Sequence, residues 1–217
     1  MKAIILLAAL VSTLCFNLRQ TKQNYDSYVF AVQWANGYCA INNCGGRESV
    51  VPKNEMSIHG LWPSLKSGSQ LNACTDGVKI TDTGSALFQN MNKYWPSFSG
   101  ANTGFWEHEY NKHGYCMAEE YGWSSYESYF QFVIDLHFRT YKDLIKNCFS
   151  STQTISYNDF VAAIRKRIPN ATINMKCAGK KNNRHISELY FYLEKNFSPS
   201  TTSRFSKQCD SGKLLFK

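Results

Sequence analysis

Two short segments about fifty residues apart hold most of the side chains in this sequence that are suited to chemistry. The first runs from Ile58 to Pro63 and contains His59 and Trp62. The second, Phe105 to Cys116, contains the titratable side chains His108, Glu109, Lys112 and His113. Two histidines can accept and donate a proton near neutral pH, and a lysine can bind an anion. This set of groups suits the cleavage of a phosphodiester bond.

The second segment brings its titratable groups onto one surface if it forms an α-helix. Residues four apart then lie on the same face, so that His108 stacks above Lys112 and Glu109 above His113. A single histidine in such a segment is usually structural. Four convergent titratable groups beside Trp106 instead predict a functional site.

A zinc peptidase is the alternative that the His-Glu pair suggests. In those enzymes two histidines are four residues apart on one helical face. Here His108 and His113 are five residues apart, which separates them by roughly 140° around an α-helix. The cysteines also lack the short spacing of a structural zinc site. We therefore predict no metal and no other cofactor.

The N-terminus indicates a secreted chain. Lys2 precedes an apolar run from Ala3 to Val11 that is too short to span a bilayer, and polar sequence begins by Asn17. We interpret residues 1–16 as a cleaved signal peptide and residues 17–217 as one functional domain. A buried N-terminal helix is the alternative. The mature protein, with no membrane attachment, is then expected outside the cell or in the lumen of a lysosome or vacuole.

Composition agrees with a single globular domain that binds a polyanion. The chain has 217 residues, 43% of them hydrophobic, and a formal net charge of +8. Positive charge favours nucleic acid, although many secreted proteins carry it for solubility alone. The net positive charge therefore supports nucleic-acid binding only in combination with the two histidine segments.

Hydrophobic patterns predict an α+β fold whose sheet is largely antiparallel, packed against several helices and stabilised by disulfides. Strands are expected at both ends of the chain, with helices between them. The expected strands cover 28–34 and 189–193, and the expected helices cover 85–94, 126 to about 145, and 158–168.

Both segments resemble the ribonuclease T2 family, which includes secreted acid-type, lysosomal, vacuolar and self-incompatibility ribonucleases. The first is similar to the family's Ile-His-Gly-Leu-Trp-Pro motif, and the second to Phe-Trp-x-His-Glu-x-x-Lys-His-Gly-x-Cys, at every defined position. Tyr110 stands where many members have tryptophan, which keeps an aromatic ring. The similarity also covers Phe30–Trp34 and Ile168–Cys177, and so spans nearly the whole mature chain.

The resemblance implies an endoribonuclease that cleaves single-stranded RNA without a metal. The ribose 2′-hydroxyl attacks the adjacent phosphorus and leaves a 2′,3′-cyclic phosphate and a free 5′-hydroxyl. By the same resemblance His113 is the general base and His59 protonates the leaving 5′-oxygen. Glu109 and Lys112 stabilise charge on the phosphorane, and His108 binds phosphate.

Three residues are candidates for contacts with the bases. Trp62 and Phe105 offer rings on which a base can stack, and because stacking tolerates any base we expect broad specificity. Gln33 is a candidate hydrogen-bond partner of a neighbouring base, and a solvent-facing strand residue is the equal alternative. Other tryptophans are expected in the core: Trp34, Trp95 and Trp106.

Eight cysteines are present, and Cys15 leaves with the signal peptide, so seven remain in an oxidising compartment. The resemblance implies the disulfides Cys39–Cys44, Cys74–Cys116 and Cys177–Cys209. Cys148 is then a buried thiol, a link to another chain, or the partner of Cys15 if the signal is cleaved earlier. Two sequons, at Asn170 and Asn196, are expected on the surface.

Two functions of different class are compatible with these observations. One is a monomeric RNA-cleaving enzyme with no obligate protein partner. The other is a secreted recognition glycoprotein on the same fold. The sequence keeps every residue to which the resemblance assigns a proton transfer or charge stabilisation, which favours the enzyme. These residues are His59, Glu109, Lys112 and His113.

Overall fold

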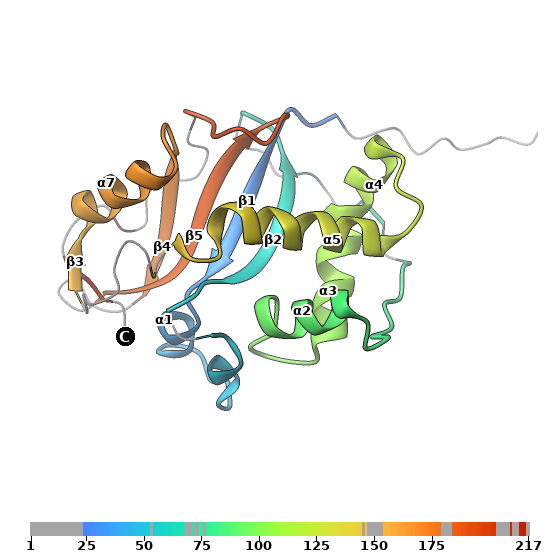
Figure 1. The fold of residues 1–217 in the computed structure, drawn as a ribbon, viewed down its shortest axis with the longest axis horizontal. Coiled ribbons are helices and arrows are strands. Elements are labelled where there is room, and N and C mark those ends of the chain that lie inside the picture. The colour runs from blue at the N-terminus through green and yellow to red at the C-terminus, as the bar shows by residue number, and fades with distance from the viewer. Residues whose placement is uncertain are drawn as a thin grey trace, which may run out of the picture.

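A six-stranded sheet with helices packed against it forms the framework of the molecule (Figure 1). The computed structural model describes residues 24–52, 54–67, 71, 74–75, 77–144, 146, 154–178, 184–202, 209 and 213–215. The predicted single α+β domain with a largely antiparallel sheet is confirmed. The predicted signal peptide and Cys148 lie outside the described residues.

The strands follow the order β2-β1-β5-β6-β3, and β4 also pairs with β5. All pairs are antiparallel except β5 with β6. Their bounds are β1 Ser27–Gln33, β2 Ser57–Ser64, β3 Thr154–Ser156, β4 Ile173–Ala178, β5 Arg184–Glu194 and β6 Lys213–Leu215. The two strands expected from the sequence fall in β1 and β5. Strand β2, which carries the first histidine segment, was not predicted.

The three predicted helices are present, but the second changes its winding before its expected end. The α-helices are α1 Ala35–Cys39, α2 Ala86–Tyr94, α3 Asn102–Glu109, α4 Tyr115–Tyr121, α5 Tyr126–Leu136 and α7 Tyr157–Arg167. A 3₁₀ turn, η1, covers Arg47–Val50, and two π-helical segments cover Tyr110–Gly114 (η2) and His137–Tyr141 (η3). The periodicity that predicted one helix to about residue 145 does not distinguish α from π winding.

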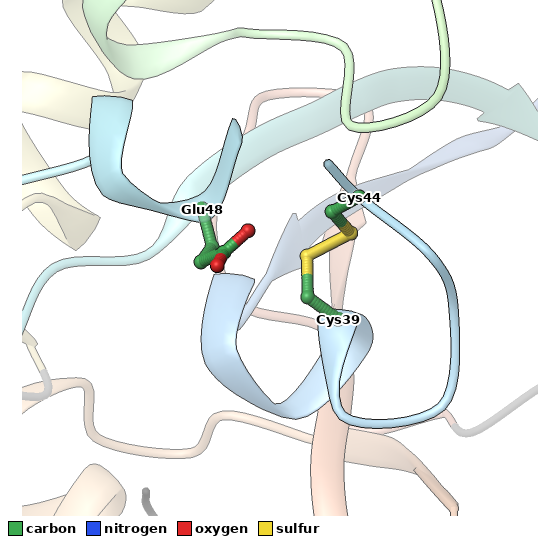
Figure 2. A group of neighbouring side chains, drawn as sticks. All are labelled: Cys39, Cys44 and Glu48. Atoms are coloured by element: carbon green, nitrogen blue, oxygen red, sulfur yellow. A yellow bond between two sulfur atoms is a disulfide. The ribbon is translucent and has the colours of Figure 1, made fainter. Parts of the chain in front are cut away.

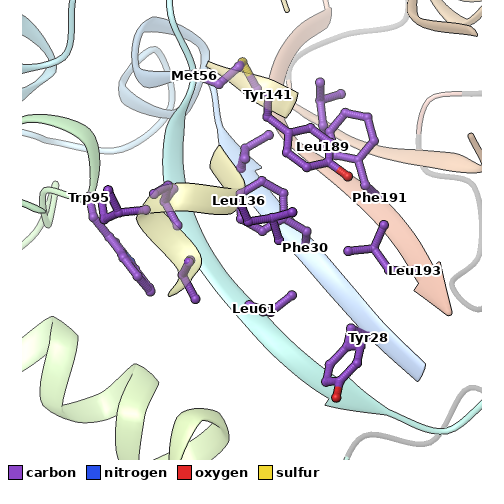
Figure 3. Packing of buried hydrophobic residues seen from close by; sticks show 14 of the residues in the cluster. Tyr28, Phe30, Met56, Leu61, Trp95, Leu136, Tyr141, Leu189, Phe191 and Leu193 are labelled. Atoms are coloured by element: carbon purple, nitrogen blue, oxygen red, sulfur yellow. The ribbon is translucent and has the colours of Figure 1, made fainter. Parts of the chain in front are cut away.

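The core lies between the sheet and α5, which crosses in front of the strands (Figure 1). Side chains alternate between the two faces of a strand, so Phe30 of β1 and Phe191 of β5 point toward the helices (Figure 3). The Tyr141 ring lies 4.5 Å from that of Phe30 and 4.6 Å from that of Phe191, measured between centroids. This packing leaves the opposite face of the sheet to a smaller cluster that includes Trp62.

The three disulfides that the resemblance implied are present. Cys39–Cys44 closes the loop after α1, Cys74–Cys116 ties a loop to the start of α4, and Cys177–Cys209 joins β4 to the C-terminal part of the chain. Cross-links of this kind restrict the unfolded chain and so stabilise the folded one. The sequon residues Asn170 and Asn196 are exposed. No helix in the described ranges has both the length and the apolar character needed to cross a membrane.

Candidate active site

His59 occupies a β-bulge in the edge strand β2. Gly60 pairs with Ala31 and Ile58 pairs with Val32 of β1, so His59 is the extra residue. A bulge resets the alternation of side chains along a strand. As a result Ile58 enters the main core, while the His59 ring lies 5.0 Å from that of Trp62. One inserted residue thus directs His59 to the side of the sheet that carries Trp62.

Two buried side chains fix the main chain of β2 around this bulge. The indole of Trp95 donates a hydrogen bond to the carbonyl of His59 (2.8 Å), and the hydroxyl of Tyr129 donates to the carbonyl of Leu61 (3.1 Å). Trp106 in turn donates to the carbonyl of Trp95 (2.8 Å). The three tryptophans expected in the core, Trp34, Trp95 and Trp106, are all buried.

The second histidine segment is helical, but it is not one continuous α-helix. Helix α3 ends at Glu109, and π-helical η2 follows, in which the N–H of Tyr115 donates to the carbonyl of Tyr110 five residues earlier. A π-helical turn is wider than an α-helical one and often marks a functional site. Both predicted pairs, His108 with Lys112 and Glu109 with His113, therefore run from the α-helix into the π-helical turn, and the wider turn sets the placement of Lys112 and His113.

A loop clamps this π-helical turn from outside. The main-chain carbonyl of Asn111 accepts hydrogen bonds from the N–H groups of Cys74 (3.1 Å) and Thr75 (2.9 Å). Its side-chain amide accepts from the N–H of Val78 (3.1 Å) and donates to the Val78 carbonyl (2.9 Å). The Cys74–Cys116 disulfide closes the same connection. The loop thus holds the turn in one conformation.

Trp62, in the first histidine segment, contacts residues of both segments. Its ring centroid is 5.0 Å from that of His59 and 5.4 Å from that of His113, and its indole N–H donates to Oε2 of Glu109 (2.8 Å). Trp62 is only 8% exposed. The ring of Phe105 lies 5.7 Å from that of His59. The fold therefore brings both segments, far apart in sequence, into one cluster.

His108 and Lys112 lie at the rim of this cluster. His108 is exposed and Lys112 is half-buried, whereas Glu109 and His113 are buried. Burial, the charge of Lys112 and the charge of His59 together lower the pKa of His108. The rim thus carries the positive charge of Lys112 beside the buried groups Glu109 and His113, while the lowered pKa of His108 favours its neutral imidazole.

The surroundings drive the two central imidazoles toward opposite protonation states. Burial, assisted by Lys112 and His108, lowers the pKa of His113 to about 2. Burial also acts to lower the pKa of His59, but the carboxylates of Glu188 and Glu109 outweigh it and raise that pKa. Burial raises the pKa of Glu109. At mildly acidic pH, His113 is therefore neutral and His59 is a cation.

Glu188 is a member of the site that the sequence analysis missed. Its Oε1 lies 3.1 Å from Nδ1 of His59 and accepts a hydrogen bond from the Gln33 amide (2.9 Å). Gln33 is buried, so the solvent-facing alternative for this residue is wrong. The available signal was an acidic residue directly before the apolar run from Leu189 to Leu193.

Gly60 leaves room for the Glu109 carboxylate. A Cβ atom at this position would overlap Oε2 of Glu109 and Nε1 of Trp62. We expect Gly60→Ala to displace Glu109 and reduce kcat/KM for the reaction at this site by at least about tenfold, since roughly 1.4 kcal/mol of lost transition-state stabilisation suffices. Steady-state kinetics on the folded variant measure this effect.

Gly104→Ala is the matched control. A Cβ at Gly104, in α3, would meet open space, so this variant should keep the kcat/KM of the wild type. Equal kcat/KM for Gly60→Ala and Gly104→Ala would show that the close approach at Gly60 has no role in activity.

Within the described ranges, one group of side chains has atoms close enough together to hold a metal ion: Cys39, Cys44 and Glu48 (Figure 2). The two sulfurs are bonded to each other in a disulfide. Metal ligation by cysteine requires a thiolate, so these residues do not fit a metal site.

Comparison with known proteins places these observations in a family. The sequence model of the ribonuclease T2 family matches residues 25–209. "Ribonuclease 1" of Arabidopsis thaliana is 34% identical over 131 residues, which is 58% of this chain and 55% of the relative, so the match spans about half of that protein. "Ribonuclease Rh" of Rhizopus niveus is 28% identical, and the match covers 100% of this chain and 99% of the relative.

The fold is shared with solved ribonuclease structures. The crystal structure of RNase NT in complex with 5′-AMP superposes with a TM-score of 0.71 at 24% identity, and the match covers 89% of this chain and 98% of that one. At this identity the similarity concerns the fold alone. The sheet and helices that assemble the histidine cluster are therefore a known architecture.

Proposed function

The chain belongs to the ribonuclease T2 family, and we propose that it is an endoribonuclease that cleaves single-stranded RNA by attack of the ribose 2′-hydroxyl on the adjacent phosphorus. The attack forms a 2′,3′-cyclic phosphate and releases the 5′-oxygen as a hydroxyl. The observation that carries the proposal is that the imidazoles of His59 and His113 both contact the ring of Trp62 and have pKa values shifted in opposite directions. Titratable pairs whose pKa values are driven apart identify the acid and the base of a reaction.

The two imidazoles divide the proton transfers between them. Neutral His113 takes the proton of the 2′-hydroxyl, and cationic His59 donates a proton to the leaving 5′-oxygen. Nε2 of His59 lies 3.8 Å from Oε1 of Glu109, which is too far for a hydrogen bond. The Nε2 proton is therefore available to the leaving group. Because His59 must be protonated, we expect activity to fall as pH rises through its pKa.

Charge on the phosphorane is stabilised from the helix. The Glu109 carboxyl, with its raised pKa, can share a proton with a phosphoryl oxygen. Lys112 supplies a positive charge, and exposed His108 binds phosphate at the rim. Preorganised groups of this kind stabilise developing charge without reorganisation during the reaction. Because the chain supplies the proton transfers and the charge stabilisation, we propose a reaction that needs no metal.

We propose that bases bind at the rings beside His59. Phe105 is half-buried and its ring contacts the His59 ring, which the Trp62 ring also contacts. Gln33 remains a candidate for a neighbouring base, although its amide is bound to Glu188 here. Stacking supports broad base specificity.

We also propose that the protein acts outside the cytosol, as a monomer. Three disulfides support an oxidising compartment, either the cell exterior or the lumen of a lysosome or vacuole. Exposed Asn170 and Asn196 support glycosylation in the secretory pathway.

The product ends test this mechanism. Purified protein incubated with single-stranded RNA in excess chelator at mildly acidic pH should give fragments with 2′,3′-cyclic phosphate and 5′-hydroxyl ends, as identified by mass spectrometry. Adding Mg²⁺ or Zn²⁺ back in excess of the chelator, as the control, should not raise the rate. Fragments with 5′-phosphate ends, or a rate that depends on added metal, would indicate a water nucleophile activated by an ion.

A further inference from the structure

We propose that Glu188 is a positioning residue that holds the Nδ1 side of the His59 imidazole, so that the proton on Nε2 faces the substrate. This inference rests on the proposed role of His59 as the general acid. It adds a residue from strand β5 to a site that otherwise comes from β2 and the helix α3–η2.

The sheet builds a polar row beside His59. Glu188 of β5 lies directly opposite Gln33 of β1 and opposite Lys176 of β4. Directly opposite residues of neighbouring strands have adjacent side chains. The β4–β5 ladder carries a bulge at Ser187, because Lys176 pairs with Glu188 and Cys177 pairs with Ile186. Both residues of the His59–Glu188 contact therefore lie at or next to a β-bulge, at His59 itself and at Ser187, which changes the direction of the neighbouring side chains.

The Glu188 carboxylate is buried and both of its oxygens are engaged. Its side chain is 3% exposed, and Oε1 lies 3.1 Å from Nδ1 of His59. Gln33 donates to the same oxygen (2.9 Å), and the hydroxyl of Tyr190 donates to Oε2. Burying a carboxylate is costly unless it is paired and hydrogen-bonded. The imidazolium of His59, with its side chain 23% exposed, is the cation nearest to this carboxylate, and the two donors fix the carboxylate that faces it.

The two carboxylates near His59 have different positions and therefore different tasks. Glu109 accepts the indole N–H of Trp62 and is 3.8 Å from Nε2 of His59. Glu188 is on the other side of the ring, at Nδ1. A partner at one ring nitrogen determines which proton the other nitrogen offers. Glu188 thus orients the acid, and Glu109 remains available to the phosphate.

The charged groups around His59 determine in which direction its pKa should change when Glu188 is replaced. Burial lowers the pKa of His59, whereas Glu188 and Glu109 raise it and Lys176 lowers it. His108 and His113, on α3 and η2, also interact with its charge. Contact with His59 in turn helps hold the pKa of Glu188 at about 2, against its burial. Removing the Glu188 charge should therefore lower the pKa of His59, and removing Lys176 should raise it.

Glu188→Gln tests the inference, because the amide keeps the shape and removes the charge. We expect the high-pH limb of kcat/KM to move to lower pH by about one unit, the size of effect of a charge within a few ångströms. Above that limb the variant should then be about tenfold slower than the wild type. NMR titration of the His59 imidazole should report the same shift. A purely structural role would lower kcat/KM at every pH and leave the limb in place.

Lys176→Met is the matched control, with the opposite expected sign. Its side chain is half exposed, and its Nζ lies 3.9 Å from Oε2 of Glu188, so the variant should fold and move the limb and the His59 pKa slightly upward. If Glu188→Gln does not fold, a His59 pKa that is lowered or unchanged in Lys176→Met overturns the inference. If Glu188→Gln folds, an unchanged His59 pKa overturns it.

The two readouts separate this inference from the proposed function. A wild-type protein that cleaves no RNA would contradict the proposed function, while the His59 titration would still decide the role of Glu188. If the wild type cleaves RNA but the pKa of His59 is the same in the wild type and in Glu188→Gln, only the inference about Glu188 is contradicted.

Discussion

Replacing either His59 or His113 with alanine will slow RNA cleavage by orders of magnitude while the fold stays intact. Each imidazole carries out one proton transfer in the proposed mechanism, and such a transfer accelerates a reaction roughly 10²–10⁴-fold. Because the two act in one step, the double variant should be little slower than the slower single variant. Single-turnover kinetics at saturating protein measure this loss apart from substrate binding.

A substrate with a good leaving group distinguishes the two roles. A uridine 3′-phosphate ester of nitrophenol releases an anion that needs little protonation. His59→Ala should therefore cleave this ester far better, relative to the wild type, than it cleaves RNA. His113→Ala should stay slow on both substrates, since the 2′-hydroxyl still needs a base. Rescue of His113→Ala in place of His59→Ala would reverse the assignment, and near-normal RNA cleavage by both variants would rule out the mechanism.

Removing the 2′-hydroxyl from the substrate should abolish cleavage completely. If the nucleophile is part of the substrate, DNA and RNA methylated at the 2′-oxygen can bind but have nothing to attack with. A DNA oligonucleotide that contains one ribonucleotide should be cut once, directly on the 3′ side of that ribonucleotide. Denaturing gels locate the cut, and competition against labelled RNA shows that the uncut DNA still binds.

Salt dependence provides an internal check on that binding. Contacts with phosphates release counterions, so affinity for both RNA and DNA should fall as salt rises. Cutting of the all-DNA strand at a rate comparable with RNA would exclude the 2′-hydroxyl as nucleophile, and the proposed function would have to be replaced.

Local sequence patterns predicted much of the secondary structure. The β-branched and aromatic residues around Phe30 predicted β1, and apolar spacing predicted α5, because that spacing reports which side of a helix faces the core. A proline after the expected helix predicted where α2 and α7 end. Strand β2 escaped prediction for a physical reason. Its bulge at His59 interrupts the period of two on which recognition of a strand depends. The π-helical turn η2 escaped because α and π windings share nearly the same local composition.

The sequence by itself determined which groups are available for chemistry: two motifs with His59, Glu109, Lys112 and His113, a framework of cysteines, and the family to which they point. Only the tertiary structure decided how they meet. The Trp62 ring contacts imidazoles from two separate elements, and Glu188 reaches His59 across the sheet from a strand more than a hundred residues later. The protonation state of each histidine follows from this assembly, because burial and neighbouring charge set a pKa, and both are properties of the folded chain rather than of any segment of it.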